Sequence, residues 1–196
     1  GGLNTAIGTN VNPVPLFGTQ ITGAGGNANG FDKTQTNQSS LYSITNGVTP
    51  TYTAVGNTSG TLNALTGYFM YVRGDRSMSL TIPLAVGMPT SSTTLRTTGT
   101  VLTGTKTSFS NAFTGGAGVL NLVTNPYPSP IDWSLVQPSC SNVATAYTFW
   151  DPNFGTRGGF VTVNTAGVAS SGLGTQFIQT GQAFFVQSTG GVPTVS

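Results

Sequence analysis

Aromatic and acidic side chains gather in two short segments of a chain that is otherwise rich in Thr, Gly, Ser and Asn. These segments are TNPYPSPIDW (124–133) and WDPNF (150–154). Aromatic rings in such segments can stack on sugar rings, and a neighbouring aspartate can accept hydrogen bonds from sugar hydroxyls. The candidate glycan-binding residues are Tyr127, Trp133, Trp150 and Phe154.

The other interpretation of residues 124–133, which we favour, is structural. Each proline fixes φ and removes a backbone donor, so the segment makes a stiff connection. Asp132 is expected near the start of a short helical turn, where its charge offsets the helix dipole. Trp133 is then a buried anchor whose indole N–H donates to a carbonyl. Burial of Trp133 and Trp150 would exclude the sugar platform, whereas adjacent exposed tryptophans would support it.

Catalytic chemistry has few candidates, because the chain has no His and no Glu and its acids are Asp32, Asp75, Asp132 and Asp151. Acid–base catalysis would require two of these distant aspartates to meet in space. No serine or threonine has a histidine to activate it. Asp151 lies in a pattern that partly matches a calcium loop, but a Pro-Asn turn capped by Asp151 explains it better. We therefore expect no enzyme activity, catalytic residue, cofactor or metal site.

The surface chemistry is set by the low charge of the chain. Only 5% of its residues are charged, against roughly 25% in a typical soluble domain. Six scattered Lys and Arg residues make no basic patch, which argues against nucleic acid as a partner. No apolar run approaches the ~20 residues that span a bilayer, so we expect no membrane insertion. The single cysteine, Cys140, permits no internal disulfide and is expected to be a small buried or half-buried apolar residue.

The elements that must position these residues are strands. Helix formers are scarce, β-branched and aromatic residues abound, and Gly and Pro punctuate the chain. The fold class is therefore all-β, and the turn spacing favours an antiparallel β-sandwich of jelly-roll type. Arg73, Gly74 and Asp75 are expected to form a plain hairpin turn. Strands are predicted over 41–45, 51–55, 67–72, 78–82, 93–102, 118–123, 146–150, 159–163 and 182–187.

Residues 1–30 differ from the rest, with isolated apolar residues, prolines and a Gly-rich end at 23–30 that predicts a flexible hinge. We predict an extended N-terminal arm or edge strand over 1–30 and a single β-sandwich domain over 31–196. The arm either completes its own subunit or adds as a strand to the next subunit and builds a filament. The residues predicted to make that assembly contact are Val11, Val14, Leu16 and Ile21.

Five segments form an ordered set of motifs: GYFMYVRGDRS (67–77), TTLRTTGTVLTGT (93–105), LNLVTNPYPSPIDW (120–133), YTFWDPNFGTRGGFVTV (147–163) and IQTGQAFFVQS (178–188). The set resembles a β-rich region of large exported surface proteins of Bacteroidota, often found just upstream of the C-terminal sorting domain of type IX secretion cargo. The resemblance implies an extracellular or cell-surface location and gives no catalytic residues.

These observations predict a non-catalytic extracellular structural or adhesive module, a mature or excised segment of an exported protein. Its partners are expected to be copies of itself or other surface proteins, and its most specific form is the self-assembling subunit of a cell-surface filament. The alternative is a carbohydrate-binding module of a secreted protein, with glycans as partners.

Overall fold

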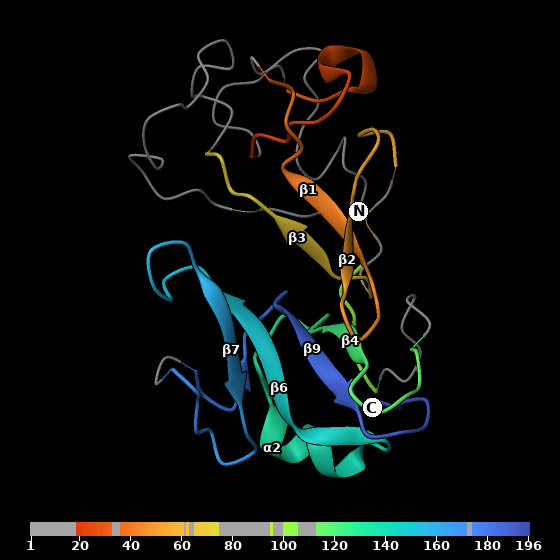
Figure 1. Cartoon of the computed structure of the whole chain (residues 1–196), viewed down its shortest axis with the longest axis vertical. Helices are drawn as coiled ribbons and strands as arrows, with labels where there is room; N and C mark the ends of the chain where they lie inside the picture. Colours follow the sequence, from red (N-terminus) through yellow and green to blue (C-terminus); the bar gives the residue numbers. More distant parts are fainter. Residues whose placement is uncertain are drawn as a thin grey trace. The chain divides into compact units, whose positions relative to one another are not determined.

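The computed structural model describes residues 19–32, 36–60, 62, 65–74, 95, 100–105, 113–171 and 174–196. Over these residues the secondary structure is mostly antiparallel strands with one short α-helix (Figure 1), which confirms the all-β class. None of the described helices is long and apolar enough to cross a membrane. The elements are η1 (Gly26–Asn29), β1 (Leu41–Thr45), β2 (Thr51–Ala54), β3 (Tyr68–Met70), β4 (Leu120–Thr124), β5 (Ile131–Asp132), α2 (Trp133–Val136), η2 (Gln137–Ser139), β6 (Val143–Asp151), β7 (Gly159–Val163), β8 (Phe177–Ile178) and β9 (Ala183–Ser188).

Alternating and continuous apolar runs locate most of these strands. β1 and β7 have the predicted bounds, and β2, β3, β4, β6 and β9 overlap their predicted runs. The predicted strand 78–82 lies outside the described residues, and the described part of 93–102 is not a strand. β5 and β8 were missed because each has two residues and pairs only with the other, too short for a sequence period to appear.

The chain divides into two compact units. The predicted boundary at residue 30 does not coincide with this division, because described residues on both of its sides belong to the first unit. The first unit comprises Gly1–Ser43, Tyr52–Asn63 and Tyr68–Thr100, and the second comprises Ile44–Thr51, Ala64–Gly67 and Val101–Ser196.

The first unit is built on a three-stranded sheet of order β2-β1-β3. β1 and β3 are antiparallel, with Leu41 opposite Met70 and Tyr42 opposite Phe69. Because strand side chains alternate between faces, Leu41 and Met70 lie on one face and Tyr42 and Phe69 on the other. The first face holds a small core of Ile21, Phe31 and Leu41, against which Val55, Leu62, Tyr68 and Met70 pack.

The Gly-rich segment 23–30 is a hydrogen-bonded turn, which corrects the prediction of a flexible hinge. It contains the 3-10 helix η1, and the Phe31 N–H donates to the Gly26 carbonyl at 3.0 Å. The Thr58 N–H donates to the Asn29 carbonyl, also at 3.0 Å. Gly30 has φ +78°, and a Cβ there would collide with the Thr58 hydroxyl. The glycine thus serves a tight turn and a close packing contact rather than flexibility.

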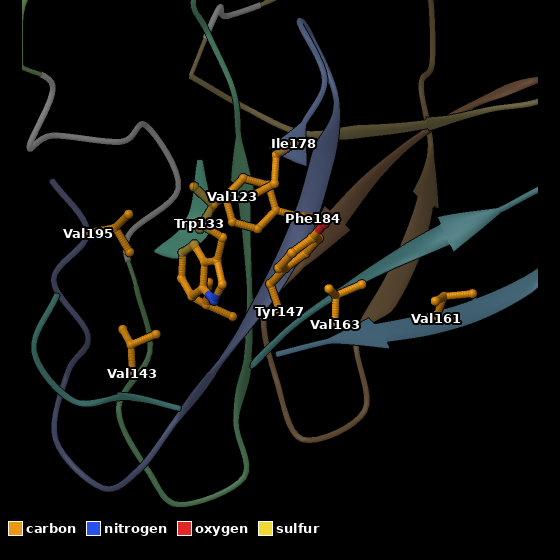
Figure 2. Packing of buried hydrophobic residues seen from close by; sticks show 10 residues of the cluster. Val123, Trp133, Val143, Tyr147, Val161, Val163, Ile178, Phe184 and Val195 are labelled. Atoms are coloured by element: carbon orange, nitrogen blue, oxygen red, sulfur yellow. The ribbon is translucent and has the colours of Figure 1, made fainter. Parts of the chain in front are cut away.

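The second unit contains a four-stranded antiparallel sheet of order β4-β9-β6-β7. The register places Val123 beside Phe184, and Tyr147 beside both Val186 and Val163. These side chains lie on one face of the sheet and form the main core with Trp133, Ile178 and Val195 (Figure 2). The β5–β8 pair and α2 therefore contribute the residues that cover this face.

Trp133 is the centre of that core, with none of its surface exposed. Its indole makes edge-on contacts with Tyr147 and Phe184, each with ring centroids 5.8 Å apart. Its Nε1–H donates to the Thr145 carbonyl at 2.9 Å. Asp132 caps the helix start by accepting a hydrogen bond from the Ser134 N–H at 2.9 Å. The structural interpretation of residues 124–133 is confirmed on both points.

Asn125 fixes the corner that leads to Trp133, a role that the sequence did not indicate. Its buried side-chain amide donates to the carbonyls of Ser129, Ile178 and Gln179 at 2.9–3.1 Å. Its Oδ1 accepts from the Tyr127 N–H at 3.0 Å. The Asn125 amide thus connects the proline-rich segment to β8 and to the turn after β8. It also provides hydrogen-bond donors for carbonyls that have no backbone N–H partner in a regular sheet, because prolines and tight turns interrupt the strands.

We expect Trp133→Ala to lower the free energy of unfolding by about 3–5 kcal/mol, because the substitution leaves a large cavity in the core. The matched control is Leu135→Ala in the same helical turn, where the side chain is 76% exposed and the expected loss is under about 0.5 kcal/mol. Denaturant melts of the two variants test this. Similar losses in both would contradict the anchoring role of Trp133.

Stability at alkaline pH should depend on Tyr147, because burial raises the pKa of its hydroxyl to about 12, against about 10 in an unfolded chain. Above pH 10 the unfolded state releases this proton first, so the free energy of unfolding falls as pH rises toward 12, by at most about 1.4 kcal/mol per pH unit. In urea melts from pH 8 to 12, the free energy of unfolding of Tyr147→Phe should fall less steeply with pH than that of the wild-type protein. The variant also loses the hydrogen bond to the Thr175 carbonyl, which lowers its stability at every pH. If the free energies of unfolding of the two proteins fell in parallel with pH, the loss of stability could not be assigned to the raised pKa of Tyr147.

Candidate functional site

The four predicted glycan-binding residues do not form one surface. Trp133 is fully buried, so its inclusion was wrong: the indole serves the core and no sugar can reach it. Tyr127 is half-buried, and its hydroxyl donates to the Gly104 carbonyl at 2.8 Å. Trp150 and Phe154 are exposed, by 37% and 41%. Of the four side chains, only those of Trp150 and Phe154 are exposed.

Trp150 and Phe154 belong to an exposed group at the end of the β6–β7 hairpin, which we call the hairpin aromatic cluster: Trp150, Phe154 and Phe160. Trp150 and Phe160 are cross-strand neighbours whose ring centroids lie 5.1 Å apart at an interplanar angle of 83°. Phe160 is 45% exposed and also contacts Phe185 of β9 at 6.0 Å. Trp150 and Phe160 lie on the face of the sheet opposite the main core, because side chains alternate along β6 and β7, whereas Phe154 lies in the turn between these strands.

The connection between β6 and β7 shapes this cluster. Asp151 Oδ1 accepts a hydrogen bond from the Asn153 N–H at 2.8 Å, so the predicted turn capped by Asp151 is confirmed. Gly158 has φ +81°, and a Cβ there would lie 2.7 Å from Trp150 Cζ2. A Cβ on Gly159 would lie 2.5 Å from Phe154 Cδ1. The glycines thus allow both rings to lie close to the backbone of the hairpin.

A second aromatic surface lies in the first unit, on the face of its sheet away from the small core. We call it the tyrosine face: Tyr42, Tyr52, Phe69 and Tyr71. Its rings meet edge to face, Tyr42 with Tyr71 at 6.3 Å, Tyr52 with Phe69 at 5.8 Å, and Phe69 with Tyr71 at 5.2 Å. Tyr52 and Tyr71 are 45% and 58% exposed. Partial burial and the nearby Tyr71 hydroxyl raise the pKa of Tyr52.

Sequence reasoning missed the tyrosine face. The available signal was the spacing of Phe69 and Tyr71 two residues apart, which places both side chains on one face of a strand. The contribution of Tyr42 depends on its register opposite Phe69, and that of Tyr52 on the position of β2 beside β1. Neither can be read from local sequence.

The described carboxylates serve the backbone. Asp32 Oδ2 accepts from the Ile21 N–H at 2.9 Å, and Asp132 and Asp151 cap a helix and a turn. Among the described residues, no three His, Cys, Asp or Glu side chains are grouped to hold a metal ion. Cys140 is half-buried against the main core, as expected, and burial raises the pKa of its thiol.

Ile21 is not available for assembly, which corrects its inclusion among the contact residues. It is buried with Phe31 and Leu41, and its carbonyl accepts from the Asp32 N–H at 2.7 Å. It therefore completes the core of its own subunit. Val11, Val14 and Leu16 lie outside the described residues, and their role stays a prediction.

The Arg-Gly-Asp tripeptide is described only in part, since Asp75 lies outside the described residues. Gly74 is buried, and its carbonyl accepts from the Gln20 N–H at 2.9 Å and the Thr19 hydroxyl at 2.8 Å. Gly74, the middle residue of the tripeptide, is thus held by hydrogen bonds within the first unit. The hairpin turn expected over residues 73–75 stays a prediction.

No family model, curated protein or solved structure matches this chain. The features of the described residues that bear on function are therefore the two exposed aromatic surfaces and the residues around them. Both surfaces offer ring edges, ring faces and neutral hydrogen-bonding groups.

The two tryptophans should differ sharply in their access to solvent. In Trp150→Phe, the remaining Trp133 is buried, so acrylamide should quench its fluorescence several-fold less efficiently than the fluorescence of Trp150 in Trp133→Phe. Emission from Trp150 should also lie at longer wavelength, because its indole contacts water. Equal quenching in the two folded variants would contradict the assignment of Trp150 to an accessible surface.

Proposed function

We propose that the chain is a non-catalytic structural or adhesive module of the cell exterior, and that its tyrosine face binds a protein partner. The observation that carries the proposal is the group of four adjoining aromatic rings, Tyr42, Tyr52, Phe69 and Tyr71, on one face of a sheet. We also propose that the antiparallel sheets form a sandwich of jelly-roll type.

The geometry of the tyrosine face favours protein over sugar. Its rings meet at interplanar angles of 77–81°, so they make no flat platform of parallel rings. They make instead an irregular surface of edges and faces. Tyrosine side chains bury a large area at low entropic cost and keep a hydroxyl for hydrogen bonding, and they are enriched where proteins bind proteins.

An extracellular location is supported by the neutral surface and by the resemblance to exported Bacteroidota proteins. A non-catalytic role is supported by the use of Asp32, Asp132 and Asp151 as acceptors for backbone N–H groups. Filament assembly through Val11, Val14 and Leu16 is the extension of this proposal. In that extension the N-terminal segment adds as a strand to another subunit.

The second candidate function, carbohydrate binding, is favoured by one specific observation: Trp150 is exposed at a hairpin end, and its ring meets that of Phe160, which is also exposed. An exposed indole edged by glycines provides one stacking surface for a sugar ring. This site would take a short neutral glycan, because the one acid and one base of the turn, Asp151 and Arg157, leave it without net charge.

Binding to wells coated with fibronectin, fibrinogen or collagen tests the protein-binding proposal. The wild-type protein should bind at least one coating saturably, and Tyr52→Ser/Tyr71→Ser should bind it at least tenfold more weakly, since interface tyrosines often contribute more than about 1 kcal/mol each. The matched control is Val168→Ser/Val192→Ser, which removes two exposed apolar side chains of the second unit and should leave binding unchanged.

Undiminished binding by the folded Tyr52→Ser/Tyr71→Ser variant would contradict the role of the tyrosine face. Depletion assays on insoluble cellulose and affinity electrophoresis in soluble β-glucan test the second candidate in parallel. Glycan binding that is lost in Trp150→Ala and retained in Tyr52→Ser/Tyr71→Ser would favour the carbohydrate-binding module instead.

A further inference from the structure

The edges of the four-stranded sheet are covered by other parts of the same unit. At the β7 edge, the Ser170 N–H donates to the Thr162 carbonyl at 2.8 Å, and Val163 bridges Ala169. At the β4 edge, Gly47 and Leu120 exchange backbone hydrogen bonds of 3.1 and 2.9 Å. Edge strands carry unpaired backbone groups that attract another chain. Here the protein itself occupies those groups.

The β2 edge of the three-stranded sheet is different. β1 is the only described strand beside β2, and all four β2 residues, Thr51–Ala54, are exposed. The strand has no charged residue and no proline, the two features that usually keep edge strands apart. The Val55 N–H donates to the Leu41 carbonyl at 3.1 Å. Because donor directions alternate along a strand, the backbone groups of Tyr52 and Ala54 point away from β1.

We propose that β2 pairs with β2 of a second copy of this chain, antiparallel and about a two-fold axis at Thr53. In this register Tyr52 and the partner subunit's Ala54 exchange two backbone hydrogen bonds, and the symmetry repeats the exchange. Thr53 and the partner subunit's Thr53 then form the closer, non-hydrogen-bonded pair between them. Each outward-pointing backbone group of Tyr52 and Ala54 thereby gains a partner.

The side chains of β2 suit this self-pairing. The large ring of Tyr52 lies opposite the small Ala54 of the partner subunit, so the rings do not compete for space. Threonine opposite threonine is a favourable cross-strand pair, and no like charges meet. The pairing also joins the tyrosine faces of the two copies into one surface, because Tyr52 contacts Phe69 on that face.

The contact is small, since one four-residue strand meets another, and such interfaces bind weakly. We therefore expect a concentration-dependent dimer rather than a permanent one. A two-fold contact closes on itself, so it adds dimer formation to the proposed function without requiring the N-terminal segment. It also does not depend on what the tyrosine face binds.

Disulfide trapping tests the register directly. In a Cys140→Ser background, Thr53→Cys should form a covalent dimer on mild oxidation, because Cα atoms of a non-hydrogen-bonded antiparallel pair lie about 4.5 Å apart, within disulfide reach. The control is Val168→Cys in the same background, at a position 64% exposed in the second unit. Thr53→Cys should give at least fivefold more dimer at equal concentration. Equal yields from the two variants would overturn the proposal.

Sedimentation of the chain without introduced cysteines provides the second measurement. Ala54→Pro removes an outward N–H, and Ala54→Lys places charges across the two-fold contact, so each should weaken dimer formation at least tenfold. Leu135→Lys, a surface control in α2, should leave it unchanged, and circular dichroism should show all three folded. Association that persists in folded Ala54→Pro would overturn the proposal, as would a wild-type chain that stays monomeric at millimolar concentration.

Tyr71→Ser should weaken binding to coated wells but retain the dimer, which separates this test from that of the proposed function.

Discussion

The packing of Trp133 between Tyr147 and Phe184 is the interaction on which the second unit depends. The β5–β8 pair has only two residues on each strand, and so short a pair has little stability of its own in water. It is held by the indole, which follows β5 directly and enters the face of the four-stranded sheet. The Nε1–H contact with the Thr145 carbonyl then fixes the direction of the ring.

Neutral hydrogen bonds supply much of the order around this core. Asn125 connects three carbonyls around the proline-rich corner, and buried Asn121 exchanges hydrogen bonds with the backbone of Thr114. An amide carries both donors and an acceptor, so it can satisfy a loop that regular ladders do not reach. A chain with few charges can in this way keep buried polar groups paired without burying ion pairs, whose desolvation is costly.

Aromatic residues serve both as core side chains and as exposed surface side chains. The two kinds lie on opposite faces of the same sheets. In β6, Tyr147 points into the main core while Trp150 points to the opposite face and is partly exposed. In the first unit, Tyr68 packs toward the small core, and its neighbour Phe69 belongs to the tyrosine face. The exposed rings of Tyr52, Trp150 and Phe160 lie on strands, so their positions are more rigid than loop positions would be. Rigid aromatic positions suit a surface that binds a partner.

The sequence by itself determined the all-β class, the location of most strands and the burial of Trp133, because alternation, proline constraints and capping residues act over a few neighbouring positions. It could not determine which strands become neighbours. The tyrosine face needs Tyr42 beside Phe69 and Tyr52 beside β1, and the buried role of Asn125 needs β8 more than fifty residues away. The Gly-rich segment 23–30 was misjudged for the same reason, since its contacts with Thr58 exist only once the first unit has folded. Tertiary structure decided these features because register and long-range packing have no local signature in a chain of short, similar strands.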